Sequence, residues 1–392
     1  MKPLDGLLIV DLSRVLACPF ATMILAELGA RVIKVEQPGT GDETRSFEPQ
    51  LAKDSAYYFA CNRSKESITV NLRSDEGRKV IRGLAAKADV VLENFPVGTL
   101  ARYGLDFVNL SALNPRLIYV SCTGFGQSGP YAQKKGYDTV FQAMGGIMSL
   151  TGERGGGPVK PGLPVADLTS GLWIAIAILA SLAGRERTGK GCCVDFSMLD
   201  GQVSLLTLAA ARYFALNEVP PRLGTEHPGR VPSATFRSKD GKYAHITASD
   251  QHWAPLCRAL GVETWGTAFA DNATRVARRD EVMNVLSAQI AKLTRAELLA
   301  KLDEVEVPVG PVNDVAEILA DPHVRARRLV GSFDYDGVGE FKALALPYKF
   351  LGWDNPEIGA PPTLGQHTES VLAELLGLSA NDVARLRSAK AI

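Results

Sequence analysis

The sequence has 392 residues, 46% of them hydrophobic and 22% charged, a balance that permits a sizeable buried core in roughly two or three domains. Lysine plus arginine equals aspartate plus glutamate, at 43 residues each. No net field therefore draws the chain to nucleic acid or to an anionic membrane. The composition excludes a disordered chain, and any anionic ligand must be held by local charges.

The spacing of cysteines and histidines and the length of apolar runs argue against a disulfide-rich, metal-binding or membrane protein. The six cysteines form no C-x-x-C pair, which suits reduced thiols in a cytosol. The five histidines all lie after residue 226 and show no metal-binding spacing, so we expect no metal site. The start of the chain lacks a basic segment ahead of an apolar one, and the longest apolar run, 172–183, is too short to span a bilayer. We therefore expect a cytoplasmic protein that does not enter a membrane.

Strand and helix patterns alternate from the N-terminus onward. Apolar runs of strand length occur at 7–12, 31–35, 89–94, 117–121 and 193–196, and helical patterns occur at 19–29, 77–88 and 168–182. The first helix ends on Gly29, which suits a C-cap. A charged turn at 184–191 links the last of these helices to the last strand. Alternation of this kind predicts an α/β fold with a parallel sheet covered by helices.

A second module follows a change in composition. Proline, glycine, arginine and histidine become frequent at about 217–231, which indicates a domain boundary. Beyond it the sequence predicts a strand at 243–247, helices at 253–260, 279–290 and 295–304, and a turn at 308–312. Two short helices close the chain, and Ser379 is a good N-cap for the second. We predict a large domain of residues 1–205 and 335–392, a small domain at 233–325, and linkers at 206–232 and 326–334.

Two glycine-rich patterns resemble phosphate-binding loops but fail on context. Residues 124–129 match G-x-G-x-x-G after a strand, yet Pro130 and a polar segment stand where a phosphate-binding helix should begin. Residues 184–190 imitate a Walker A loop, but Gly191 replaces the magnesium-binding serine or threonine and the loop follows a helix. No G-x-S-x-G elbow occurs. The glycines of 124–129 instead predict a loop that a ligand or backbone approaches closely.

Asp167 stands immediately before the apolar helix of the first module. At that position it is well suited to cap the helix, because aspartate is among the best N-cap residues. The helix dipole at the same position favours an ionised carboxylate, which is the form that acts as a nucleophile. Capping and catalysis are compatible, so both roles stay open for Asp167.

Over essentially its whole length the sequence resembles the class III (CaiB/BaiF-type) CoA-transferase family. The matching stretches are 10–19, 29–36, 93–95, 124–130, Asp167 before its helix, 187–191, 194–197 and 376–392. The resemblance implies a Rossmann-like large domain with a parallel sheet, a smaller α/β domain, and an interlocked homodimer in which each chain threads the other. Long extended connections around 217–232 and 307–313 are consistent with that assembly.

The resemblance also implies a covalent mechanism. In such enzymes an aspartate, here Asp167, attacks the thioester of an acyl-CoA donor, and CoA returns to give an aspartyl-CoA thioester that an acceptor acid then cleaves. One thioester replaces another, so no ATP, metal or permanently bound cofactor is required. Acyl-CoA and small carboxylic acids are the expected ligands, with coenzyme A as a substrate.

Contacts with CoA are implied at positions in the first turn, after the third strand, beyond the glycine loop and after the last strand. These residues are Val15, Ala17, Asn94, Phe95, Arg102, Lys135, Tyr137 and Met198. Arginine and lysine suit the phosphates of CoA, and small or apolar residues suit its pantetheine arm. The alternatives are core packing for Phe95 and Met198 and solvated surface charge for Arg102 and Lys135.

The sequence also resembles acyl-CoA racemases, whose fold is similar but which carry a histidine in a G-H-D segment. Here Tyr137 occupies that position, 30 residues ahead of Asp167, so one base of a two-base proton transfer is absent. We therefore expect a transferase. A racemase or isomerase and a catalytically silent CoA-binding protein are the alternatives.

The acids exchanged are indicated only weakly. Formyl-CoA transferases carry a glutamine where this chain has Leu16, and a tetraglycine loop where it has 222–228. The Leu-Gly-x-x-His segment followed by Val-Pro is more similar to the branch that uses succinyl-CoA or other dicarboxylic acyl groups. Leu16 is then a candidate substrate contact, and Arg222, His227 and Arg230 are candidate contacts for the acceptor carboxylate, with ordinary linker positions as the alternative for these three.

Overall fold

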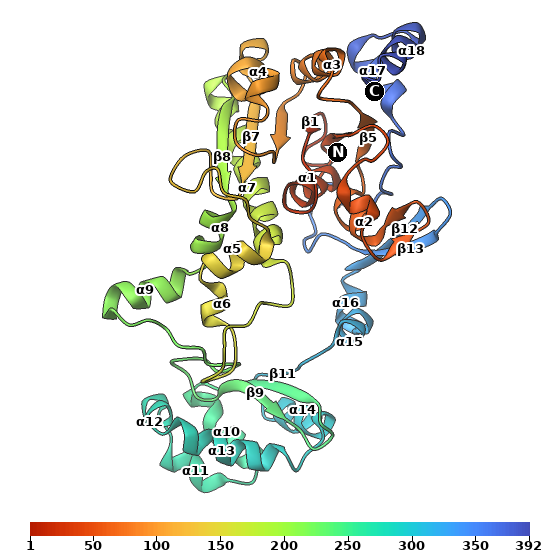
Figure 1. The fold of residues 1–392 in the computed structure, drawn as a ribbon. Helices are drawn as coiled ribbons and strands as arrows, with labels where there is room; N and C mark the ends of the chain where they lie inside the picture. The colour runs from red at the N-terminus through yellow and green to blue at the C-terminus, as the bar shows by residue number, and fades with distance from the viewer. The chain divides into compact units, whose positions relative to one another are not determined.

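The computed structural model describes residues 1–392, which divide into two compact units (Figure 1). The large unit comprises Met1–Ile147, Lys160–Ala211 and His323–Ile392, and the small unit comprises Met148–Val159 and Arg212–Pro322. The small unit thus includes Met148–Val159, a segment that the sequence-based boundaries assign to the large domain.

A six-stranded sheet forms the centre of the large unit, as the α/β prediction requires. Its order is β5-β2-β1-β6-β7-β8, and every neighbouring pair is parallel. The strands are β1 (Leu8–Asp11), β2 (Arg31–Glu36), β5 (Glu66–Thr69), β6 (Val90–Glu93), β7 (Ile118–Thr123) and β8 (Cys192–Ser197). The direction of strand succession reverses between β1 and β6. Loops leaving the carboxyl ends of these two strands therefore diverge, and such a switch point is where open α/β sheets bind ligands.

Helices bury both faces of this sheet. The elements on them are α1 (Ala17–Glu27) and α7 (Val165–Thr188) on one face, and α3 (Asp75–Ala85), α4 (Phe107–Leu113), α17 (Thr368–Leu376) and α18 (Ala380–Ser388) on the other. Alternation along a strand sends Ile9 to the first face and Val10 to the second. Because α17 and α18 share a core with α3, the end of the chain completes the large unit.

Helix α7 is longer than the sequence pattern predicts. It continues through 184–188, which was predicted as a turn, and ends at Gly189 with φ of 70°. Its last turn is held by Arg185, which lies 2.9 Å from Asp89. By length and composition the helix is apolar enough to cross a membrane, so the argument from a short apolar run fails. Within the chain it packs against α1 and the sheet.

Shorter elements complete the large unit, and two of them, α9 and α16, extend across its boundary with the small unit. They are η1 (Glu43–Ser46), β3 (Gln50–Leu51), β4 (Asp54–Ser55), α2 (Ala56–Asn62), η2 (Ala101–Tyr103), α5 (Asp138–Met144), α8 (Met198–Ser204), α9 (Thr207–Leu216), α16 (Pro322–Ala326), β12 (Val330–Tyr335) and β13 (Gly339–Leu344). The β12–β13 hairpin packs on α2 through Phe333, Tyr335 and Phe59. Helix α6 (Ile147–Leu150) begins at the last residue of this unit's first stretch and continues into the small unit.

The small unit has its own core and an antiparallel sheet of order β11-β10-β9. Its elements are β9 (Ser233–Arg237), β10 (Tyr243–Thr247), α10 (Asp250–Ala259), α11 (Glu263–Ala268), α12 (Asn272–Ala277), α13 (Arg279–Ile290), α14 (Arg295–Glu304), β11 (Val309–Pro311) and α15 (Val315–Ala320). The predicted limits of β10, α13 and α14 agree with the structure. The predicted turn at 308–312 is wrong, because Val309–Pro311 pairs with β10 as a strand.

Candidate active site

A groove of about 970 Å³ opens at the switch point of the large sheet. It is lined by the loops that follow β1, β2, β5 and β6, and its charged or aromatic lining includes Arg14, Arg73 and Phe95. The Arg14 guanidinium lies 5.3 Å from the centre of the Phe95 ring. Arg73 and the Phe95 ring suit a phosphate and a flat heterocycle, whereas Arg14 is already paired with Glu43 of the same groove at 3.0 Å.

The first turn, between β1 and α1, has a strained backbone. Val15 has φ of 70°, which is a genuine outlier for a β-branched residue and costs about 1–3 kcal/mol. The Val15 N–H donates to both carboxylate oxygens of Asp42, at 3.2 and 3.3 Å. Asn94 accepts from the Arg14 N–H at 3.0 Å and donates to the Arg14 carbonyl at 2.8 Å. Two of the residues implied for CoA binding, Val15 and Asn94, therefore meet here, and Asn94 acts by holding the loop.

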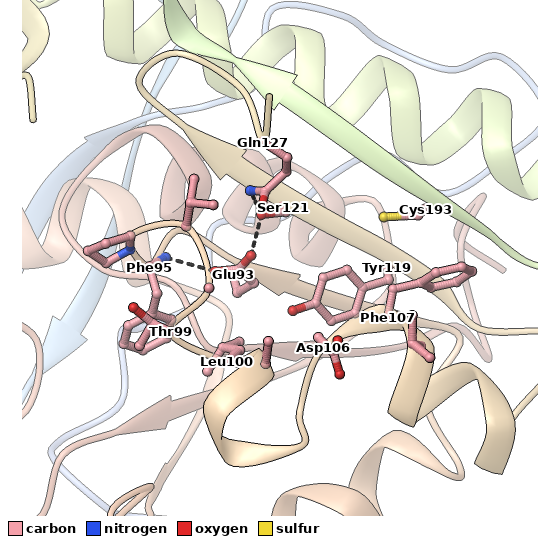
Figure 2. A pocket seen from close by; sticks show the side chains of 15 residues that line it. Glu93, Phe95, Thr99, Leu100, Asp106, Phe107, Tyr119, Ser121, Gln127 and Cys193 are labelled. Carbon is pink, nitrogen blue, oxygen red and sulfur yellow. Dashed lines mark hydrogen bonds between the residues drawn. The ribbon is translucent and has the colours of Figure 1, made fainter. Parts of the chain in front are cut away.

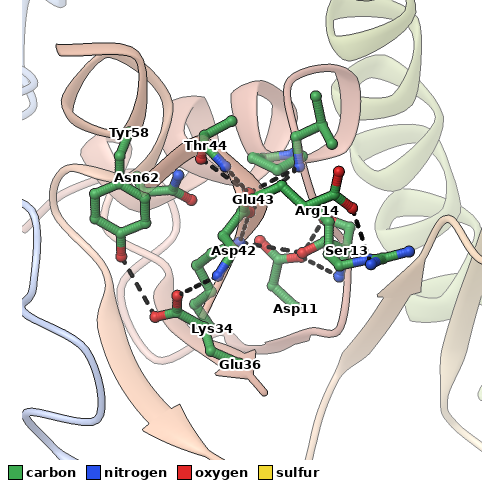
Figure 3. Close-up of polar contacts among 12 residues, drawn as sticks. Asp11, Ser13, Arg14, Lys34, Glu36, Asp42, Glu43, Thr44, Tyr58 and Asn62 are labelled. Atoms are coloured by element: carbon green, nitrogen blue, oxygen red, sulfur yellow. Dashed lines mark hydrogen bonds and ion pairs between the residues drawn. The ribbon is translucent and has the colours of Figure 1, made fainter. Parts of the chain in front are cut away.

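Buried charges lie beneath this turn (Figure 3). Lys34 is fully buried, lies 2.8 Å from Asp42, and donates to the Ser13 carbonyl at 3.1 Å. Asp11 is also buried and accepts from Ser13, from Thr22 at 2.6 Å and from Lys65 at 3.2 Å.

These lysines determine the charge states beneath the turn. Burial raises the pKa of Asp42 and of Asp11, but the neighbouring lysines and hydroxyl donors outweigh it and hold both pKa values below the usual range. Burial lowers the pKa of Lys65 to about 8, against the attraction of Asp11. Two ionised carboxylates thus anchor the first turn from below.

A second cavity, of about 290 Å³, contains Asp167. The residues that line it come from the first turn, η1, α2, α5 and the start of α7: Val15, Leu16, Thr44, Phe47, Tyr57, Cys61, Asp138, Lys160, Gly162, Pro164 and Asp167. Phe47 lines both this cavity and the larger groove, so the two adjoin at the first turn.

Asp167 does not cap its helix, which removes one of the two roles left open for it. Pro164 is the N-cap residue of α7, and Asp167 lies in the first turn without a side-chain capping bond. The carboxylate of Asp138 does the capping, since it accepts from the N–H groups of Ala166 at 2.9 Å and Asp167 at 3.2 Å.

The surroundings of Asp167 also favour its protonated form more than the position in the helix suggests. Burial and then the charge of Asp138 raise the pKa of Asp167 to about 7. Its own carboxylate is paired with no side chain.

The other residues implied for CoA binding are dispersed around the large unit. Phe95 lines the groove, Ala17 is buried as the first residue of α1, and Met198 begins α8 and packs against the core beneath α1 and α7. Arg102, Lys135 and Tyr137 are exposed, with Tyr137 82% exposed. The structure thus brings Val15, Leu16 and Asp167 into one cavity and leaves these three at the surface.

The three candidate acceptor contacts belong to the small unit. Arg222 already donates to the carbonyls of Gly156 at 2.9 Å and Ser149 at 3.2 Å. His227 accepts from the Gly229 N–H at 3.1 Å, and Arg230 is exposed. Their role stays a prediction.

A third cavity, of about 260 Å³, lies beside the groove (Figure 2). The Glu93 carboxyl accepts from the Phe95 N–H at 2.8 Å and from the Ser121 hydroxyl, which in turn accepts from Gln127 at 2.8 Å. Burial raises the pKa of Glu93 to about 7 despite these donors. Because Gln127 belongs to the glycine loop, this chain of bonds ties the glycine loop to the loop after β6. The close approach in the glycine loop is by a side chain rather than by backbone, because a Cβ on Gly124 would lie 2.5 Å from the Phe141 ring.

Sequence patterns missed several residues of the site. Asp138, Asp42, Tyr57 and Lys160 entered no prediction, yet each lines or supports the cavity of Asp167. The signal for Asp138 is its place in the segment 136–138, which matches the last residue of the racemase G-H-D segment. For Asp42 the signal is the Asp-x-Thr pattern of an N-cap residue: its carboxylate caps η1 by accepting from the Thr44 N–H at 2.9 Å.

Comparison with known proteins identifies the family. Residues 4–368 match CoA-transferase family III. The chain belongs to CoA-transferase family III. As a member of this family, it is a CoA-transferase, which confirms the prediction from motif order.

Named relatives and a solved structure match nearly the full length. The chain is 38% identical to succinyl-CoA:glutarate CoA-transferase of Homo sapiens, over 99% of this chain and 90% of the human protein. It is 40% identical to succinate–glutarate CoA-transferase of Agrobacterium fabrum, over 95% and 96% of the two chains. The crystal structure of a CaiB/BaiF family protein from Brucella suis superposes with a TM-score of 0.87 at 42% identity, over 95% and 99% of the chains.

Replacing Lys34 by methionine tests the support beneath the first turn of this CoA-transferase. The substitution leaves Asp42 buried without its cation, so we expect the free energy of unfolding to fall by about 3–5 kcal/mol. Urea denaturation measures the change. The control is Lys79→Met, which breaks an exposed pair with Glu76 and should leave the free energy of unfolding almost unchanged. Equal, small losses in both variants would contradict the anchoring role.

Proposed function

We propose that this CoA-transferase moves CoA between a dicarboxylyl-CoA donor and a free dicarboxylic acid through a thioester on Asp167. The observation that carries the proposal is an unpaired carboxylate inside a cavity. Helix α7 is capped by Asp138, so the Asp167 carboxylate is free to attack a carbonyl carbon.

In each step of this exchange one anion, a carboxylate or a thiolate, attacks and one anion leaves. The Asp167 carboxylate attacks the thioester carbonyl, the carbon–sulfur bond breaks, and CoA thiolate leaves behind a mixed anhydride. The thiolate then attacks the aspartyl carbonyl, which releases the donor acid as a carboxylate and forms aspartyl-CoA thioester. The acceptor carboxylate reverses both steps. No proton is transferred, so no general base is needed at the reacting carbon.

The groove and the cavity together offer a path for CoA as a substrate. Arg73 suits the phosphates, and Phe95 suits the adenine ring. The pantetheine arm would then cross the first turn, since Arg14 lines the groove and Val15 lines the cavity of Asp167. In this placement Arg102, which donates to the groove residue Thr99, supplies further positive charge.

Dicarboxylic acids are supported by the relatives named above and by the charge of the cavity. Lys160 is the one cationic side chain among the lining residues, beside two aspartates. An ammonium group there suits the carboxylate of the acid that does not react. The racemase alternative has no support here, because Tyr137 does not line the cavity.

We also propose that the chain is a cytoplasmic homodimer, interlocked as the family resemblance implies, and that α7 does not enter a membrane. Only 33% of the most apolar window of α7 is buried within one chain. Helix α9 exposes Leu208 at 84% and Phe214 at 81%. Large exposed apolar side chains on these two helices favour an interface with a second chain. Sedimentation equilibrium should give twice the 42.0 kDa of one chain, and a monomer at micromolar concentration would contradict the proposal.

Covalent trapping tests the role of Asp167. We expect incubation with succinyl-CoA followed by borohydride to convert the Asp167 side chain to an alcohol, which peptide mass spectrometry locates. Asp167→Ala should lose the adduct and at least about a thousandfold of activity. Asp200→Ala is the matched control, because Asp200 also lies in the first turn of a helix but is exposed and outside the cavity. An adduct at another residue, or full activity in Asp167→Ala, would refute the mechanism.

An acceptor series tests the substrate class. With succinyl-CoA as donor we expect glutarate and other dicarboxylates to react with a higher kcat/KM than monocarboxylates of equal length. Lys160→Met should raise KM for dicarboxylates about 10-fold or more, as expected for loss of a charged hydrogen bond, and leave KM for monocarboxylates nearly unchanged. Equal effects on both kinds of acid would remove Lys160 from the recognition of the second carboxylate.

A further inference from the structure

Both carboxylate oxygens of Asp138 accept hydrogen bonds, whereas the carboxylate of Asp167, which lines the same cavity, accepts none. One oxygen, Oδ1, accepts from the N–H groups of Ala166 and Asp167. The other, Oδ2, accepts from Nε2 of Gln142 at 2.6 Å, and Gln142 is fully buried. The carboxylate is therefore fixed between α5 and the first turn of α7.

The two N–H groups bound by Asp138 are those that an N-cap side chain ordinarily satisfies. Pro164, at the N-cap position of α7, has no side-chain acceptor. If Asp167 bonded to the backbone in place of Asp138, its carboxylate would be engaged and turned away from a substrate. Because the Asp138 carboxylate on α5 already binds these N–H groups, the Asp167 carboxylate is not drawn to the backbone.

We propose that Asp138 is a positioning residue for Asp167: it caps α7 from α5 and so leaves the Asp167 carboxylate unpaired and directed at the thioester. The inference rests on the proposed role of Asp167 as the nucleophile.

The charge of Asp138 has a second effect. Burial contributes most to the raised pKa of Asp167, and the negative charge of Asp138 adds to it. The other titratable groups that line the cavity are Tyr57 and Cys61 on α2 and Lys160 ahead of α7. Asp200 on the adjoining α8 is exposed and outside the lining. Asp138 is thus the one carboxylate that faces Asp167.

A more basic carboxylate is the better nucleophile, but it must be ionised to react. With a pKa of about 7 for Asp167, kcat/KM should fall on the acid side and reach about a tenth of its plateau at pH 6. Removing the charge of Asp138 lowers this pKa, so the acid limb should move to lower pH. Removing the cap should instead lower kcat at every pH.

Two substitutions separate these effects. Asp138→Asn keeps an acceptor for the helix, and the Oε1 atom of Gln142, which has no partner, becomes available to the new amide. We expect a thermal midpoint near that of the unaltered enzyme and an acid limb displaced to lower pH. Asp138→Ala removes the acceptor, and we expect kcat to fall about 10- to 100-fold while KM for succinyl-CoA stays nearly constant.

Ser74→Ala is the matched control, because Ser74 caps α3 in the same unit and lines neither the groove nor the two cavities described above. It should lower the thermal midpoint without changing kcat or the acid limb. The proposal is overturned if Asp138→Ala behaves like Ser74→Ala, or if Asp138→Asn leaves the acid limb in place. Borohydride trapping on the unaltered enzyme tests Asp167 independently, so an adduct at Asp167 together with a silent Asp138 would reject only this inference.

Discussion

The buried pair of Lys34 and Asp42 joins the sheet to the site. Lys34 belongs to β2, Asp42 lies in the loop after it, and the Asp42 carboxylate reaches the N–H of Val15 in the loop after β1. One ion pair therefore couples the loop after β2 to the loop after β1, and the latter borders the switch point. Because breaking such a pair leaves a buried charge uncompensated, the first turn keeps a backbone conformation that a valine adopts only under constraint.

Three aspartates near the first turn show how environment assigns roles to one chemical group. Asp42 and Asp138 each bind several donors and act on the backbone. Asp167 has no donor, is largely enclosed, and keeps a proton more readily than usual. A carboxylate that is satisfied stabilises structure, whereas one that is desolvated and unpaired is available for covalent chemistry.

The agreement between sequence patterns and structure depends on how local the determining contacts are. Helices α14 and α18 were predicted correctly because their capping residues, Thr294 and Ser379, bond within three residues along the chain. The end of α7 was missed because Arg185 pairs with the distant Asp89. Strand β11 was missed because a three-residue strand is defined only by its partner β10.

By itself the sequence determined the α/β class, the family and the candidate nucleophile, since periodicity, motif order and residue type are local properties. Tertiary structure decided which side chain caps α7, how readily Asp167 loses its proton, and how Val15 is held. Those outcomes depend on groups 29 and 27 residues apart along the chain. Burial and the proximity of such groups arise only when the loops at the carboxyl ends of the sheet are brought together.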